Sequence, residues 1–127
     1  MITKSRFLLE QFLTNNQQQP LLIVSNIKFE PYNFMVLPAD IDERELHVQS
    51  EWQTQLNQIA KKDKAYLVIE NLDEISMTQQ EQFIGLIKDK RAGIYKLPTN
   101  VQIIMPVKNC NAVSEKIKKL SLVWKAE

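Results

Sequence analysis

The sequence has 127 residues, a length that fits one domain of ordinary size, so we expect residues 1–127 to form a single domain. Sixteen Lys and Arg balance fifteen Asp and Glu, and the formal net charge of +1 excludes a strong overall field for nucleic acid or a membrane surface. A single cysteine, Cys110, excludes an internal disulfide and a thiolate metal cluster. No stretch approaches the roughly 18 apolar residues of a membrane span. We therefore expect a cytoplasmic protein with no membrane partner.

The first elements are a helix and two short strands. Apolar residues near helical spacing predict a helix over about 3–15, and a polar run before Pro20 closes it. The runs LLIVS (21–25) and FMVLPA (34–39) are apolar on both faces, which is typical of buried parallel strands.

The connection between these two strands is unusually short. Its eight residues, 26–33, are fewer than the dozen or so that a parallel crossover with a helix needs. We expect either an extended connection or antiparallel pairing of the two strands. Either arrangement leaves apolar sheet surface to be filled, and the candidates are Ile27, Phe29, Tyr32, Phe7 and Phe12.

Strands and helices alternate through the rest of the chain. Acidic capping residues open the segment 40–47, and an apolar stripe predicts a helix within 50–64 that presents Trp52, Leu56, Ile59 and Ala60. A strand follows in AYLVIENL (65–72). The next helix begins with Thr78 and Glu81 as a capping box, and basic residues and Gly93 mark its end.

The last third of the chain repeats the alternation. The predicted elements are a turn at YKLPTN (95–100), a strand at 101–107, a short helix at 111–120 and a fifth strand at 121–126. This order predicts an α/β fold with three layers and a mainly parallel five-stranded sheet.

Residues 34–109 resemble, in the order and spacing of their segments, the core of the AAA+ ATPases, most nearly the MoxR-type and midasin-like branch. The segments that carry the resemblance are FMVLPADIDERELH, EWQTQLNQIAKK, YLVIENLDEIS, TQQEQFIGLIKDKRAG, KLPTN and VQIIMPVKN. The resemblance implies a reduced P-loop NTPase-like (AAA+-like) domain.

The phosphate-binding loop of that family has no counterpart. A Walker A motif needs glycines, because unhindered backbone N–H groups must wrap the phosphates. The whole sequence contains only Gly85 and Gly93, where average usage of about 7% gives roughly nine. We also expect the family's helical lid to be absent.

The other family positions are also altered. The Walker B carboxylates align with Glu70 and Asn71, and asparagine does not serve as a base at neutral pH. Asp73 and Glu74 are expected to be caps or solvent-facing charges. The sensor position aligns with Lys108 and Asn109, the second of which is equally explained as a turn residue, and the family's arginine aligns with Lys119. These remnants predict no catalytic residue and no cofactor.

Metal and hydrolytic sites are also not expected. His47 is the only histidine, and no second nitrogen or thiolate ligand stands near it in the sequence. Cys110 fits a small apolar role better than a reactive thiol.

Basic residues gather near the ends of three predicted helices. Because helices preceding parallel strands end on one side of a sheet, the three groups are expected to converge there as a basic face. They are Lys61, Lys62 and Lys64; Lys88, Lys90 and Arg91; and Lys116, Lys118 and Lys119.

Two functions follow as hypotheses. The first is a catalytically inactive AAA+-like domain that acts as a protein-binding or regulatory subunit of another protein, such as an ATPase of related fold. The alternative is a DNA-binding accessory protein that uses the basic helix ends for phosphate contact.

Overall fold

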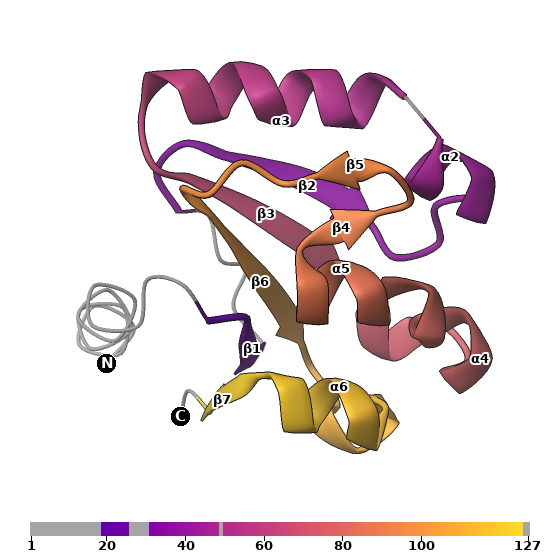
Figure 1. Ribbon diagram of the computed structural model, residues 1–127. Coiled ribbons are helices and arrows are strands. Elements are labelled where there is room, and N and C mark those ends of the chain that lie inside the picture. Colours follow the sequence, from indigo (N-terminus) through magenta and orange to yellow (C-terminus); the bar gives the residue numbers. More distant parts are fainter. Residues whose placement is uncertain (1–18, 26–30, 49, 126–127) are drawn as a thin grey trace.

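A five-stranded parallel sheet forms the centre of the computed structural model, which describes residues 19–25, 31–48 and 50–125 (Figure 1). The strand order is β2-β3-β6-β1-β7, and all four neighbouring pairs are parallel. The strands are β1 (Leu21–Val24), β2 (Phe34–Pro38), β3 (Ala65–Glu70), β6 (Val101–Val107) and β7 (Leu122–Lys125). The predicted α/β fold and its five strands are confirmed.

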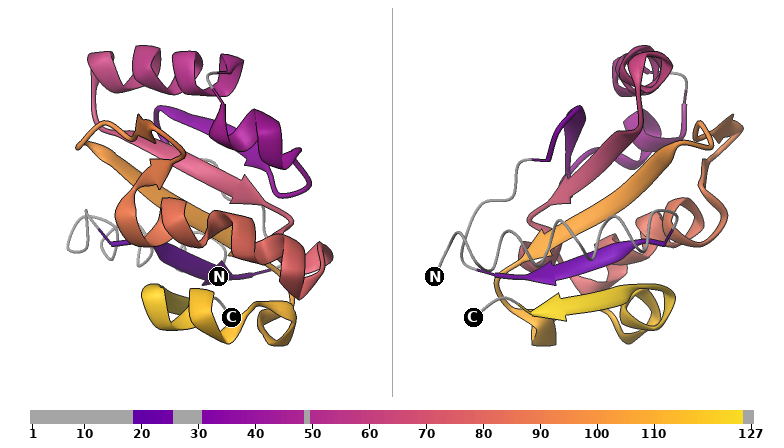
Figure 2. Two further views of the ribbon diagram at one scale, coloured as in Figure 1. Left: turned by 45° about the vertical axis from the view of Figure 1, so that its right-hand side comes forward. Right: turned by 90° about the vertical axis from the view of Figure 1, so that its left-hand side faces the viewer.

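The helices of the described chain lie on one side of this sheet (Figure 2). They are α2 (Glu43–His47), α3 (Glu51–Lys62), α4 (Met77–Gln80), α5 (Ile84–Asp89) and α6 (Glu115–Leu120). Single 3-10 turns are η1 (Leu72–Glu74), η2 (Glu81–Phe83) and η3 (Cys110–Ala112). The helix expected over 3–15 lies outside the described residues, and the described residues form two of the three predicted layers.

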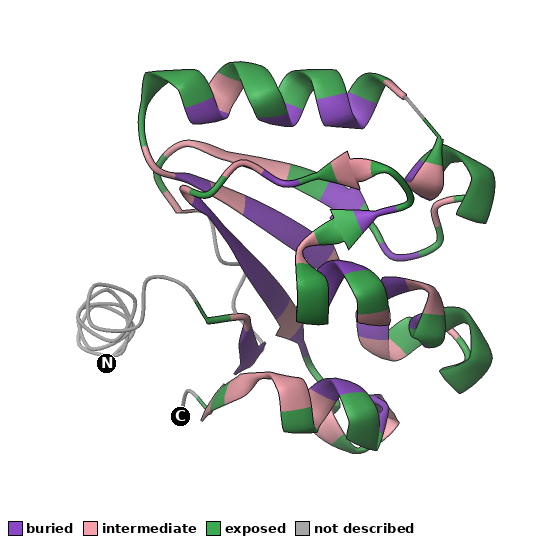
Figure 3. Cartoon of the chain, viewed as in Figure 1, coloured by how far each residue is buried: buried purple, intermediate pink, exposed green. Residues whose placement is uncertain are grey.

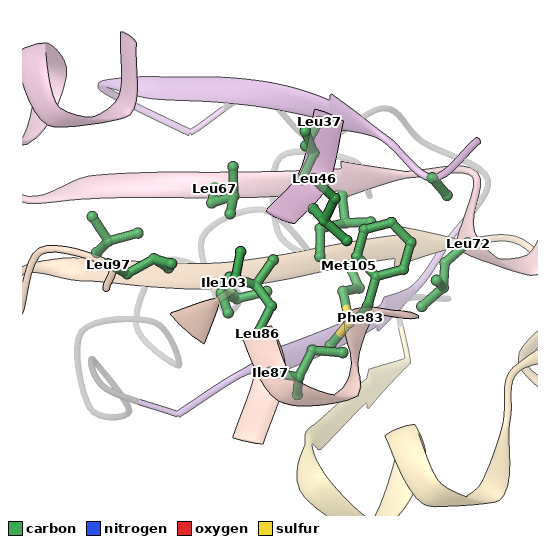
Figure 4. Close-up of a cluster of buried hydrophobic side chains, with 14 of the residues drawn as sticks. Leu37, Leu46, Leu67, Leu72, Phe83, Leu86, Ile87, Leu97, Ile103 and Met105 are labelled. Carbon is green, nitrogen blue, oxygen red and sulfur yellow. The ribbon is translucent and has the colours of Figure 1, made fainter. Parts of the chain in front are cut away.

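The main core fills the space between the helices and the sheet (Figure 4). Alternate residues of β3 and β6 point into it, among them Leu67, Ile103 and Met105, and Phe83 and Leu86 meet them from the helical side. Figure 3 shows the exposed residues on the outer sides of the helices. The opposite face of the sheet carries a second buried cluster of Leu21, Ile23, Val68 and Ile104. Strands buried on both faces explain why the sequence shows continuous apolar runs rather than alternation.

Helix α3 matches its predicted stripe and has an unforeseen cap. Trp52, Leu56 and Ala60 are buried, as expected. At its carboxyl end the side chain of Asn33 donates to the carbonyls of Ile59 (2.9 Å) and Lys64 (3.0 Å). Asn100 donates in the same way to Ala60 (2.7 Å) and Asp63 (3.0 Å). Side-chain amides from two loops thus satisfy carbonyls that the helix end leaves open.

The predicted capping box at Thr78 and Glu81 is wrong, because the observed box begins two residues earlier, at Ser76. Ser76 is the N-cap of α4; its hydroxyl accepts from the Gln79 N–H (3.1 Å), and the Gln79 side chain accepts from the Ser76 N–H (3.1 Å). Both patterns satisfy the spacing rule, because glutamine serves as well as glutamate at the third helical position.

The helix expected to run on to Gly93 ends earlier. α5 ends at Asp89, and Lys90 follows it in the left-handed region with φ 56°. Arg91–Ala92 (β4) and Tyr95–Lys96 (β5) then pair as a small antiparallel hairpin where the sequence predicted a helix end and a turn. Gly93, at φ 64°, therefore serves the hairpin turn, where a Cβ would collide with the carbonyl oxygen of His47.

The first two strands are not antiparallel partners. β3 and β6 lie between β2 and β1, and all of these strands run in the same direction. Tyr32, which we expected to help fill the sheet surface, is 77% exposed, so that prediction is wrong. The other four residues named for this role, and most of the connection itself, lie outside the described residues.

Among the described helices, none combines the length and the apolar character needed to cross a lipid bilayer.

Candidate functional site at the carboxyl edge of the sheet

The carboxyl ends of β3 and β6 bring the remnant positions of the sequence to one edge of the sheet. Glu70 ends β3, is half-buried, and its backbone carbonyl accepts from the Ala39 N–H (2.9 Å). Asn71 follows in the left-handed region with φ 64° and is exposed. Lys108 and Asn109 follow β6 and are both exposed. Because β3 and β6 are neighbours in the sheet, the four residues share this edge.

Asp73 connects the two strand ends. Its Oδ2 atom accepts hydrogen bonds from the backbone N–H groups of Lys108 (2.9 Å) and Asn109 (2.9 Å). The sequence predicted a cap or a solvent-facing charge here; the structure places a half-buried cap that joins η1 to the residues after β6. The carboxylate thus satisfies two donors that the end of β6 leaves without a strand partner.

Asn109 serves the turn after β6. Its side chain accepts from the Asn111 N–H (3.1 Å) and caps η3, which confirms the interpretation of Asn109 as a turn residue. Cys110 is half-buried against the main core, in keeping with a small apolar role.

At this edge the side chains of Asp73 and Asn109 therefore bond to backbone N–H groups of the neighbouring turn. In the described ranges no group of three or more His, Cys, Asp or Glu side chains is placed to hold a metal ion. His47 lies at the end of α2, where its Nδ1 is 3.0 Å from the Glu43 carbonyl oxygen.

Two of the basic groups meet at the opposite edge of the sheet. The Lys64 ammonium lies 3.4 Å from the side-chain oxygen of Gln102 and 5.2 Å from the ring centre of Tyr66. The Lys90 ammonium lies 3.4 Å from the Val101 carbonyl oxygen. Burial lowers the pKa of both lysines, and the charge of Lys90 lowers the pKa of Lys64 further. Lys61, Lys62, Lys88 and Arg91 are exposed.

The third basic group divides between local ion pairs. Lys116, at the start of α6, lies 3.5 Å from the carboxylate of Glu81. Lys118 pairs with Glu115 at 3.0 Å, and Lys119 is exposed. Lys116 contacts Glu81 of η2, and this ion pair does not join it to Lys64 or Lys90.

Gln80 is a fully buried residue that the sequence did not indicate. Its Nε2 donates to the Ala112 carbonyl (2.7 Å) and to the Ile75 carbonyl (3.3 Å), and its Oε1 accepts from the Ser114 N–H (2.7 Å). A glutamine in the polar first turns of a helix is usually expected to face solvent. Gln80 is buried by a loop 32 residues away, and no local pattern indicates that contact.

Two grooves on the surface were also missed. They share the segment 40–42, which the sequence indicated only as a helix cap, and have volumes of about 660 and about 610 Å³. Asp42 does cap α2, accepting from the Arg44 N–H at 2.8 Å. The grooves depend on how α3, α4 and β2 meet around that segment, which no local pattern reveals.

The fold has solved counterparts. Two structures of RuvB mutants from Thermotoga maritima superpose on this chain with a TM-score of 0.55 each, at 12% sequence identity. RuvB is an AAA+ ATPase. The fold is AAA+-like. The match covers 98% and 99% of this chain but 44% of each RuvB chain, so this sequence spans less than half of those proteins. No protein-family model matches the sequence, and no curated protein matches it.

Proposed function

We propose that this chain is a catalytically inactive AAA+-like domain, with a motif order nearest to the MoxR-type and midasin-like branch, that acts by binding another protein. A regulatory subunit of an ATPase of related fold is the role that we favour. The proposal combines an AAA+-like fold with two polar side chains after the strand ends, Asp73 and Asn109, that bond to backbone N–H groups.

The observation that carries the proposal is the position of Asp73. In a nucleotide-hydrolysing site the carboxylates after this strand hold magnesium and orient water. Here those positions align with Glu70 and Asn71, and the next carboxylate, Asp73, accepts from the backbone N–H groups of Lys108 and Asn109, the sensor position, at 2.9 Å each. A side chain held in this way closes the strand edge and is not directed at a phosphate.

The segment after β1 supports the same conclusion by its composition. Residues 25–33 contain no glycine, so every residue has a Cβ, which restricts how closely its backbone N–H can approach a phosphate. Glu70 and Asn71 are then left without a substrate to act on.

The test is the melting temperature of the wild type and of the Glu70→Gln variant with a panel of nucleotides and Mg²⁺. We expect the same melting temperature with and without nucleotide in both proteins. A rise in the wild type that disappears in Glu70→Gln would overturn the proposal, because it would demonstrate a nucleotide site that depends on this carboxylate.

A second candidate function is phosphate contact with nucleic acid through the basic edge. The observation in its favour is that the Lys64 and Lys90 ammonium groups lie beside consecutive residues at the start of β6, Gln102 and Val101. Against it, both ammonium groups have hydrogen-bond acceptors within the chain, and Lys118 and Lys116 are in ion pairs. Gel shifts over a salt series test it: binding that falls steeply as salt rises would favour this function.

A further inference from the structure

Among the described residues, the outer strand β2 pairs with another strand on one side only, and two hydrogen bonds show which side that is. The Tyr66 N–H donates to the Asn33 carbonyl at 3.1 Å, and the Ala39 N–H donates to the Glu70 carbonyl at 2.9 Å. Peptide groups of a strand alternate between its two sides. Residues 33, 35, 37 and 39 therefore direct their N–H and C=O groups toward β3.

The even-numbered residues of β2 direct their backbone groups away from the sheet. These residues are Phe34, Val36 and Pro38, and β3 is the only strand that pairs with β2 in the described chain. Pro38 has no N–H to leave open, and its carbonyl accepts from the Ile41 N–H (3.1 Å). Phe34 and Val36 are thus the positions at which another strand can pair, and Val36 is 38% exposed.

A groove of about 610 Å³ runs beside this edge, between β2 and the first turns of α3, which lies above β2 in Figure 1. Val36, Pro38 and Trp52 provide its apolar wall. Its charged lining consists of Asp40, Asp42, Glu45 and Glu51, and no Lys or Arg lines it.

The acidic lining continues past the end of β2. The adjoining groove shares Asp40 and Asp42 and adds Glu43 and Glu81, with no Lys or Arg among its lining residues. The Glu81 carboxylate lies 3.5 Å from the Lys116 ammonium, so among the described residues the unpaired charge of this groove comes from the other three carboxylates. The chain as a whole carries a formal charge of +1, so the acidity is local to this surface. An unpaired strand edge beside a row of carboxylates selects a partner that offers both backbone groups and positive charge.

We propose that the edge of β2 binds an extended, Lys- or Arg-bearing segment of another protein, which adds to the sheet as a sixth strand. The backbone of the segment pairs with Phe34 and Val36, and its basic side chains reach the carboxylates at the end of the groove. This inference rests on the proposed protein-binding function and names the chemistry of the partner and its surface.

The test uses fluorescence anisotropy of the full chain with labelled eight-residue peptides of alternating Lys and Val. We expect saturable binding that weakens as salt rises, and no binding of the peptide with Glu in place of Lys. Two further peptides carry N-methyl groups at either the Lys or the Val positions, which blocks donation from one side of the strand. We expect one of them to bind at least about tenfold more weakly, because its inward-facing donors are lost.

Variants of the protein test the same edge. Val36→Pro removes an outward N–H without touching the pairing to β3, and it should weaken binding about tenfold, whereas Val36→Thr keeps the N–H and should bind as the wild type does. The triple change Asp40→Asn, Glu45→Gln, Glu51→Gln should also weaken binding. The matched control Glu74→Gln removes an exposed carboxylate that does not line the groove and should have no effect.

Three results would overturn the inference. They are equal binding of the Lys and Glu peptides, equal binding of the methylated and unmethylated Lys peptides, and self-association that Val36→Pro abolishes with no peptide binding. The last would assign the edge to a second copy of the chain. The nucleotide test of the proposed function is independent: unchanged melting temperatures with no peptide binding would refute this inference alone, and a nucleotide-dependent rise would refute the proposed function.

Discussion

Replacing Asp73 by alanine should destabilise the fold, because one carboxylate holds the ends of β3 and β6 together. The change removes two hydrogen bonds of 2.9 Å from the backbone N–H groups of Lys108 and Asn109. A hydrogen bond to a charged group contributes about 1.5–3 kcal/mol where it is shielded from water. Asp73 is half-buried and both bonds are open to solvent, so water replaces part of each bond. We expect a loss of about 2 kcal/mol in the free energy of unfolding.

The assay is urea unfolding of the wild type and the variants, followed by circular dichroism, with thermal melts as a second measure. A loss of about 2 kcal/mol corresponds to a fall of about 5–10 °C in melting temperature for a domain of this size. Asp73→Asn keeps an acceptor oxygen without its charge and should lose about half as much. The control is Glu74→Ala, since Glu74 is the exposed neighbour, and it should stay within about 0.5 kcal/mol of the wild type. Equal stability of Asp73→Ala and Glu74→Ala would refute the reasoning.

Three further predictions concern other parts of the fold. Gln80→Met should lower the free energy of unfolding in urea by about 2–4 kcal/mol. The change keeps the side-chain volume but leaves the Ser114 N–H and the Ala112 carbonyl, before α6, without their partner. A loss below about 1 kcal/mol would contradict this. Gly93→Ala should lower the free energy of unfolding by about 1–2 kcal/mol or more, since Gly93 has a φ of 64° and an added Cβ would meet the carbonyl of His47. An unchanged stability would show that the hairpin turn has a different conformation. Burial raises the pKa of Tyr95 to about 12, so Tyr95→Phe should remove the highest step in the phenolate absorbance titration; if that step remains, another tyrosine is responsible. In the folded chain Tyr95 therefore keeps its proton after the unfolded chain has lost it, and its contribution to stability falls as pH rises from about 10 to about 12.

The strands and their order along the chain follow from the sequence because their signal is local. Runs such as 101–107 are mostly apolar on both faces, which is typical of a strand buried on both sides. The stripe of α3 is local in the same way. The capping box was misplaced because two overlapping patterns, at Ser76 and at Thr78, obey the same spacing rule, and packing of the helix decides between them.

The functional surfaces were harder to predict because they join distant segments. Gln80 contacts a loop 32 residues away. Asp73 contacts Lys108 and Asn109, which lie 35 and 36 positions after it in the sequence. The groove beside β2 depends on which strand lies at the edge, and the strand order cannot be derived from the alternation of helices and strands alone. The carboxylates at 40–45 were therefore visible in the sequence only as helix-capping residues.

The most direct test of the central claim is isothermal titration calorimetry of the full chain with ATP and Mg²⁺. We expect only the heat of dilution, in the wild type and in Glu70→Gln alike. The segment after β1 has no glycines to wrap a phosphate, and Asp73 is bonded to the residues after β6. Saturable binding in the micromolar range by the wild type, lost in Glu70→Gln, would contradict it and establish a working nucleotide site.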